Sequence, residues 1–148
     1  MDWKWQSFNE LSGKEMHDIL AVRQRVFVVE QSCVYQDADE FDSRSWHLTG
    51  RKGTGDIEIY ARLLCPGSRF VEPSFGRLLT RKSMRNTGFA RTAVGMVIAK
   101  SQKEYPGQNI KISAQVYLAD FYSGFGFKVI GELYDEDGID HIDMILQL

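Results

Sequence analysis

The sequence has few cysteines, few prolines and no long apolar run. Its 148 residues include two cysteines and three prolines. Cys33 and Cys65 lie outside any CxxC spacing, which excludes a disulfide framework and a cysteine-based zinc site; we expect inert thiols, although Cys33 could line a site. No apolar stretch reaches the roughly 18 residues that cross a bilayer, and the first residues lack a secretory pattern. We expect a cytoplasmic protein with no membrane partner.

Neither positive nor negative residues are in large excess. Eighteen basic residues stand against 20 acidic ones, for a net charge of −2, so overall charge does not favour nucleic-acid binding. The chain is 43% hydrophobic and 12% aromatic, which is enough for a folded core. Its length is close to the roughly 150 residues of one domain. We therefore expect a single domain over residues 1–148.

The charges that are present are separated along the chain. Residues 77–103 contain seven basic residues and no acid. Residues 30–42 contain five acids, residues 132–143 contain six, and neither block has a Lys or Arg. Any one such block is most often a solvated surface. Together they indicate a protein that holds an anion on one side and a cation nearby.

Two hydrophobic periods alternate along the chain. Period-two alternation predicts strands and a period near 3.6 predicts helices. Ser12 and Glu15 form a capping-box pattern before the first helix, and residues 30–43 read as loop. Early hairpins followed by strand–helix–strand crossovers predict a mixed α/β sheet. The expected strands are 3–8, 46–51, 57–64, 75–80, 110–116, 127–133 and 139–146, and the expected helices are 13–29, 88–104 and 118–125.

The segment Arg85-Asn86-Thr87-Gly88-Phe89-Ala90 joins a strand that ends at Thr80 to the second long helix. Gly88 permits positive φ or a close backbone approach. The first N–H groups of a helix have no intrahelical partner and lie at the positive end of its dipole, where a pyrophosphate fits. The spacing is neither a Walker loop nor a Rossmann fingerprint. The anion must therefore be bound by another scheme.

These residues resemble the cofactor motif of the GNAT acyl-CoA N-acyltransferases. That motif is Arg or Gln, two residues, Gly, one residue, then Gly or Ala, and Arg85, Gly88 and Ala90 match it in a strand-to-helix context. Residues 114–127 are similar to the family's strand, short helix and "FY…GF" segment. Residues 27–39 and 136–144 resemble the ElaA-type subfamily. Together these segments extend over most of the chain.

The resemblance implies a GNAT-like α/β fold and a cofactor site. The fold would be a mixed, mostly antiparallel sheet of about seven strands, with helices on both faces and a splay between the fourth and fifth strands. Acetyl-CoA would lie in the splay. Asn86 and Thr80 depart from the commonest family residues, but both contacts use backbone groups. The implied cofactor-binding residues are Leu78, Leu79 and Thr80 for the pantetheine arm, and Arg85, Asn86, Thr87, Gly88, Phe89 and Ala90 for the pyrophosphate.

The implied activity is transfer of an acetyl group from acetyl-CoA to a primary amine, by direct attack in a ternary complex. Tyr122 matches the family's tyrosine near the thioester sulfur and is the candidate general acid, although its apolar stripe also fits a core residue. Glu30, acting through a water, and His141, which alternates with Asp143, are candidate bases. The chemistry does not require a dedicated base. The acidic blocks at 37–42 and 135–143 would steer a cationic acceptor electrostatically.

Other functions are weighed against this one. A non-catalytic acyl-CoA-binding sensor would keep the fold. A nucleic-acid binder is disfavoured because aromatics do not interleave with the basic block. The EF-hand-like segments that begin at Asp37 and Asp135 place Leu48 and Leu146 at the twelfth position, so no metal is expected. We expect the acceptor to be a small-molecule or peptide amine, and an exposed final strand could pair across a homodimer.

Overall fold

The computed structural model describes residues 1–148, which form seven strands and three α-helices. The helix expected over residues 13–29 is α-helical to Arg23 and continues as a π-helical segment, Gln24–Glu30. No helix is long and apolar enough to span a bilayer. The strands are β1 (Asp2–Ser7), β2 (Ser45–Arg51), β3 (Ile57–Leu64), β4 (Ser74–Thr80), β5 (Ile110–Gln115), β6 (Lys128–Glu136) and β7 (Ile139–Leu146), and the helices are α1 (Gly13–Arg23), α2 (Phe89–Glu104) and α3 (Ala119–Ser123).

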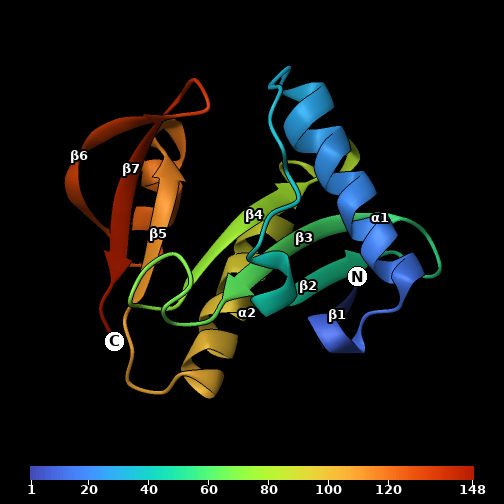
Figure 1. The fold of residues 1–148 in the computed structure, drawn as a ribbon, viewed down its shortest axis with the longest axis horizontal. Coiled ribbons are helices and arrows are strands. Elements are labelled where there is room, and N and C mark those ends of the chain that lie inside the picture. Colours follow the sequence, from blue (N-terminus) through green and yellow to red (C-terminus); the bar gives the residue numbers. More distant parts are fainter.

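The strands form two antiparallel sheets, ordered β1-β2-β3-β4 and β5-β7-β6. One backbone hydrogen bond, from Lys111 N–H to the Pro73 carbonyl (3.1 Å), joins the starts of β4 and β5. Beyond it the two strands separate, which opens the fold between them (Figure 1). The expected splay between the fourth and fifth strands is therefore confirmed.

The long helices cover opposite faces of the four-stranded sheet, with α1 in front and α2 behind in Figure 1. The alternation of β3 explains this arrangement. Ile59, Ala61 and Leu63 belong to the same buried cluster as the apolar residues of α2, whereas Tyr60 is buried in a separate cluster with Ile19 of α1. Each face of β3 thus buries apolar surface against its own helix.

The start of α1 has the expected capping box. The Glu15 N–H donates to Ser12 Oγ (3.1 Å), and the Ser12 N–H donates to Glu15 Oε2 (2.9 Å). The bond from the Ser12 backbone and the nearby Lys4 ammonium lower the pKa of Glu15 to about 2. These two orphan N–H groups are satisfied locally, which fixes where the helix begins.

The position of the last strand differs from the expectation. β7 lies between β5 and β6, so both of its edges are paired and it cannot pair with a second chain. The exposed edge belongs to β6, which precedes it. The chain returns through the tight β6–β7 hairpin into the centre of the sheet, and local alternation carries no information on this order.

Candidate active site

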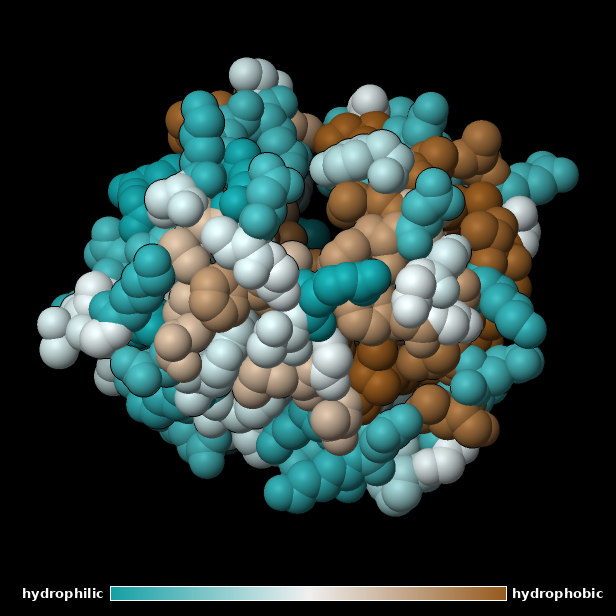
Figure 2. Space-filling view, turned by 180° about the vertical axis from the view of Figure 1, so that it is seen from behind, coloured by the Kyte–Doolittle hydropathy of each residue, from teal (hydrophilic) through white to brown (hydrophobic).

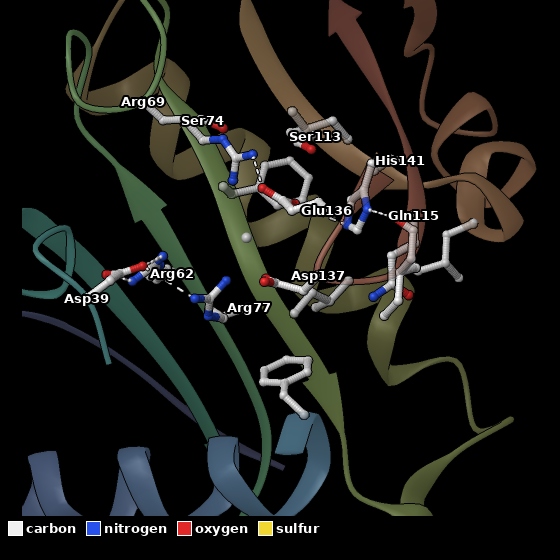
Figure 3. Close-up of a pocket in the computed structure, with 18 of the residues that line it drawn as sticks. Asp39, Arg62, Arg69, Ser74, Arg77, Ser113, Gln115, Glu136, Asp137 and His141 are labelled. Atoms are coloured by element: carbon white, nitrogen blue, oxygen red, sulfur yellow. Dashed lines mark hydrogen bonds and ion pairs between the residues drawn. The ribbon is translucent and has the colours of Figure 1, made fainter. Parts of the chain in front are cut away.

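A cavity of about 590 Å³ lies where the two sheets separate. From the side of α2, the surface is hollowed between the two sheets, and apolar side chains gather beside the hollow over the half that carries β5–β7 (Figure 2). Figure 3 shows polar side chains from both sheets that point into the cavity. Its walls come from β4, β5, the β6–β7 turn and the segment after α1, and include Cys33, Tyr35, Arg62, Arg69, Ser74, Arg77, Leu78, Ser113, Gln115, Tyr122, Glu136, Asp137 and His141.

The predicted anion loop leads into α2 and is open to solvent. Gly88 is the N-cap of α2 with φ +84°, and a Cβ placed there would meet nothing within 4 Å. The backbone N–H groups of residues 88–91 have no acceptor within the chain. Asn86 has φ +61°, a left-handed conformation that asparagine tolerates better than most residues. The loop therefore presents free N–H donors at the positive end of a 16-residue helix.

Arg85 is held at the edge of this loop. Its Nε donates to the Thr80 carbonyl (3.1 Å), and its Nη2 lies 2.5 Å from Glu30 Oε2. Glu30 belongs to the π-helical segment and does not line the cavity. The structure thus brings Glu30 to the anion loop and not to the cavity that Tyr122 and His141 share.

The predicted pantetheine-binding residues lie on a distorted, half-paired strand. Tyr60 pairs with Leu79, and Arg62 with Gly76, so β4 carries one residue more than β3 between these pairs. This bulge contains Arg77, whose φ is +52°. Leu78 lines the cavity, while Leu79 is buried against α1. Because β4 has a strand neighbour on one side only, its other edge offers free peptide groups to an extended ligand.

Tyr122 is both a core residue and a cavity residue. It is 7% exposed, and its ring packs edge-on against Phe75 and Phe127, with centroids 5.9 and 6.1 Å away. Its hydroxyl has no hydrogen-bond partner within the chain and is not among the fully enclosed polar atoms. Burial raises the pKa of Tyr122 to about 12, so the phenol keeps its proton at neutral pH.

His141 has both ring nitrogens engaged. Nδ1 lies 2.7 Å from the Ile139 carbonyl, which only accepts, so Nδ1 carries a hydrogen. Nε2 lies 3.2 Å from Glu136 Oε2, and Arg69 Nη2 lies 2.6 Å from the other oxygen of Glu136 (Figure 3). The second nitrogen therefore faces a carboxylate rather than the open cavity. His141 is therefore not positioned to take a proton from a substrate in the cavity.

The sequence analysis missed a buried ion-pair network under the cavity. Arg23 on α1 is fully buried and contacts two carboxylates, Asp37 (2.8 Å) and Asp42 (2.6 Å). Arg62 on β3 binds Asp39 through both terminal nitrogens (2.5 and 2.6 Å) and also reaches Asp42 (2.7 Å). Arg77 in the β4 bulge contacts Asp37 (2.8 Å). Three arginines thus balance three aspartates.

This network corrects the interpretation of residues 37–42 as a steering surface. Asp37, Asp39 and Asp42 are neutralised from within, so they do not attract a distant cation. Burial alone would raise the pKa of Asp39 and Asp42, but hydrogen bonds and charge from the arginines lower it overall. One signal was available in the sequence: Arg23 falls on the apolar stripe of the first helix, together with Ile19 and Val26.

The second acidic block is only partly neutralised. Glu136 is paired with Arg69 and His141, whereas Asp137 lines the cavity without a side-chain partner. The structure contains no group of three or more His, Cys, Asp or Glu side chains that could hold a metal ion. The charges that remain at the cavity are therefore few and local.

Comparisons with known proteins agree with this geometry. A family model described as "Acetyltransferase (GNAT) domain" matches residues 65–148. A UPF0039 protein of Synechocystis is 51% identical over 100% of this chain and 96% of its own length. The crystal structure of Escherichia coli ElaA has a TM-score of 0.90 at 31% identity, and that of an acyl-CoA N-acyltransferase from Pseudomonas aeruginosa has 0.92 at 31%, each covering 97% of both chains.

The chain belongs to the GNAT acetyltransferase family, with ElaA proteins among its relatives. It is an acyltransferase with the family's mixed α/β fold. The predicted family and fold are confirmed.

Proposed function

We propose that this protein is an N-acetyltransferase that moves an acetyl group from acetyl-CoA to a primary amine by direct attack in a ternary complex. One observation carries the proposal: the cavity that Tyr122 lines lies in the opening between β4 and β5, and the chain runs from the open edge of β4 at Thr80 to the free N-terminus of α2. The helix N-terminus suits a pyrophosphate and the cavity suits a thioester. The name of the Pseudomonas aeruginosa relative supports an acyl-CoA donor.

The residues present fit coenzyme A. The free N–H groups of residues 88–91 and the Arg85 guanidinium would hold the pyrophosphate. The unpaired edge of β4 at Leu78, Leu79 and Thr80 would pair with the amide groups of the pantetheine arm. A backbone N–H at the β4 bulge would donate to the thioester oxygen as negative charge develops there. Binding both reactants in line removes much of the entropic cost of the reaction.

Tyr122 is the proposed general acid. Its phenol stays protonated at neutral pH and has no competing acceptor within the chain. It would give its proton to the departing thiolate of CoA, because a neutral thiol is the better leaving group. The acceptor amine, on a small molecule or a peptide, would lie in the same cavity, which Asp137 and Gln115 also line.

Two measurements test this function. The first is a calorimetric titration with acetyl-CoA and with CoA. The second is release of CoA thiol in the presence of 1,4-diaminobutane, 2-phenylethylamine, glycinamide and a lysine-containing peptide. We expect micromolar binding of both forms and turnover with at least one amine. Binding without turnover would favour the alternative, a non-catalytic acyl-CoA sensor. Absence of binding would contradict the proposed function.

A further inference from the structure

A chain of three side chains leads from the cavity wall to a carboxylate. Ser113 on β5 lines the cavity and lies directly opposite Asp143 on the neighbouring strand β7. Tyr134 on β6 bridges them: its hydroxyl is hydrogen-bonded to Ser113 Oγ and lies 2.7 Å from Asp143 Oδ1. Figure 3 shows Ser113 in the β5 wall, across the cavity from Arg62 and Asp39.

The chemistry of the three groups fixes which of them donates each hydrogen bond. The Asp143 carboxylate only accepts hydrogen bonds, so the Tyr134 hydroxyl donates its one hydrogen to Asp143. The Ser113 hydroxyl must then donate to the Tyr134 oxygen. Ser113 therefore presents only lone pairs to the cavity. A molecule next to Ser113 must therefore donate a hydrogen bond to it. An ammonium or amine N–H can do so, whereas the oxyanion of an acyl-transfer intermediate cannot.

We propose that Ser113, Tyr134 and Asp143 form a proton-accepting relay for the nitrogen of the amine acceptor. The inference rests on the proposed function and supplies the base that Glu30 and His141 do not supply from their positions. Ser113 is the member that touches the substrate; Tyr134 and Asp143 are positioning residues that act through it. Because Ser113 presents only lone pairs to the cavity, it favours acceptors that arrive as primary ammonium ions.

The proposed step balances. One N–H⁺ bond of the ammonium breaks as its proton passes to Ser113 Oγ, the Ser113 proton passes to Tyr134, and the Tyr134 proton passes to Asp143. The neutral amine then forms the C–N bond, the C–S bond breaks, and the thiolate takes the Tyr122 proton. The second nitrogen proton passes through water to the Tyr122 phenolate and restores the phenol, and Asp143, whose side chain is 25% exposed, releases its proton to solvent.

The surroundings of the relay suit this role. Burial raises the pKa of Tyr134, so its hydroxyl remains a neutral donor at physiological pH. Lys111 Nζ on β5 lies 3.7 Å from Asp143 Oδ2. The His141 ring stacks on Tyr134 with centroids 6.0 Å apart, and it belongs to the Arg69–Glu136–His141 group. These are the charged and titratable groups that face the relay.

The test compares Asp143→Asn and Tyr134→Phe with the wild-type protein and with Asp140→Asn. Asp140 is an exposed carboxylate on the same strand without a hydrogen-bond or ion-pair partner, so it is the matched control. Asparagine keeps an acceptor for the Tyr134 hydroxyl and removes only the charge, so the variant should fold. Thiol release is measured from pH 6 to pH 10 with 1,4-diaminobutane or whichever amine of the panel the wild type turns over.

We expect Asp143→Asn and Tyr134→Phe to lower kcat/KM for the amine about 100-fold near pH 7. The Kd of acetyl-CoA and the melting temperature of Asp143→Asn should not change. The deficit should shrink as the pH approaches the pKa of the amine, because a neutral amine needs no base. A rate deficit that stays the same at every pH would indicate a structural defect and would overturn the relay. Equal rates for Asp143→Asn and wild type would overturn it as well.

The failure of the relay is distinguishable from that of the proposed function. If the wild type turns over an amine and the relay variants match it, only the relay is wrong. If the wild type binds acetyl-CoA but turns over no amine in the panel, the proposed function fails, and the relay fails with it. A pH-dependent deficit confined to the relay variants, with Asp140→Asn at wild-type rates, supports both.

Discussion

Arg85 Nη2 lies 2.5 Å from Glu30 Oε2, which joins two residues 55 positions apart in the sequence. The pair links the segment after α1, which continues into the cavity wall, to the loop that opens α2. Both side chains are partly exposed, at 42% and 31%. The carboxylate therefore lies beside the proposed pyrophosphate site, where it would oppose a bound anion.

Glu30→Gln should tighten CoA binding by about fourfold. A carboxylate about 5 Å from a phosphate charge in an aqueous environment costs roughly 0.8 kcal/mol. Arg85 keeps its position without Glu30, because its Nε also donates to the Thr80 carbonyl. Calorimetric Kd values for CoA check this, with Arg85→Ala as the opposite control, which should weaken binding. We expect kcat to stay unchanged; a large fall in kcat would make Glu30 the general base after all.

Most of the fold could be predicted because the local patterns are strong. Ser12 and Glu15 satisfy each other at the start of α1, and Pro106 and Gly107 follow the end of α2, so these boundaries are encoded within a few residues. The place of β7 between β5 and β6 depends on long-range pairing, which alternation does not encode. Gly76 inside β4 is a sequence signal for a bulge, but the positive φ falls on the neighbouring Arg77, which local sequence does not indicate.

The site was only partly predictable for a similar reason. The anion loop is one continuous segment, so Arg85 and Gly88 could be found by motif. The relay of Ser113, Tyr134 and Asp143 comes from three strands and exists only after the sheet forms. Acidic residues look alike in sequence whether they are solvated or buried, so the sequence does not show that Asp37, Asp39 and Asp42 are paired internally.

Tyr122→Phe should lower kcat about 100-fold and leave the Kd of acetyl-CoA within twofold. The variant loses the proton donor but keeps the ring, which packs against Phe75 and Phe127. The hydroxyl has no hydrogen-bond partner within the chain, so the free energy of unfolding should change little. Thiol-release kinetics and calorimetry on the same preparation measure both quantities. Equal loss of binding and turnover would identify Tyr122 as a structural residue.

Gly88→Glu should abolish binding of CoA. The substitution places a carboxylate at the free N-terminus of α2, where like charge opposes the pyrophosphate. Gly88→Ala is the matched control: a Cβ there meets nothing within 4 Å, so only the conformational cost of φ +84°, about 1–2 kcal/mol of folding stability, applies. We expect Gly88→Ala to bind CoA detectably. Calorimetry decides, and unchanged affinity in Gly88→Glu would disprove the loop assignment.

Asp42→Asn should destabilise the fold by about 3–5 kcal/mol near pH 7. Asp42 Oδ1 accepts from Arg23 (2.6 Å) and from Arg62 (2.7 Å), so the substitution leaves two buried guanidinium groups short of one counter-charge. Asp56→Asn is the control. Asp56 is 77% exposed and pairs with Arg81 on the surface, where such a pair contributes about 1 kcal/mol or less. Urea unfolding of both variants and of the wild type measures the difference.

The effect of Asp42→Asn should also depend on pH in one direction. The pKa of Asp42 is lowered in the folded protein from its ordinary value of 3.8, because the arginines outweigh the cost of burial. The stabilisation is therefore complete above pH 3.8 and disappears as the pH falls through the lowered pKa. The wild type and Asp42→Asn should converge in stability toward pH 2, while Asp56→Asn should follow the wild type. A difference between wild type and Asp42→Asn that stays constant from pH 7 to pH 2 would mean that shape, and not ionisation, makes this aspartate important.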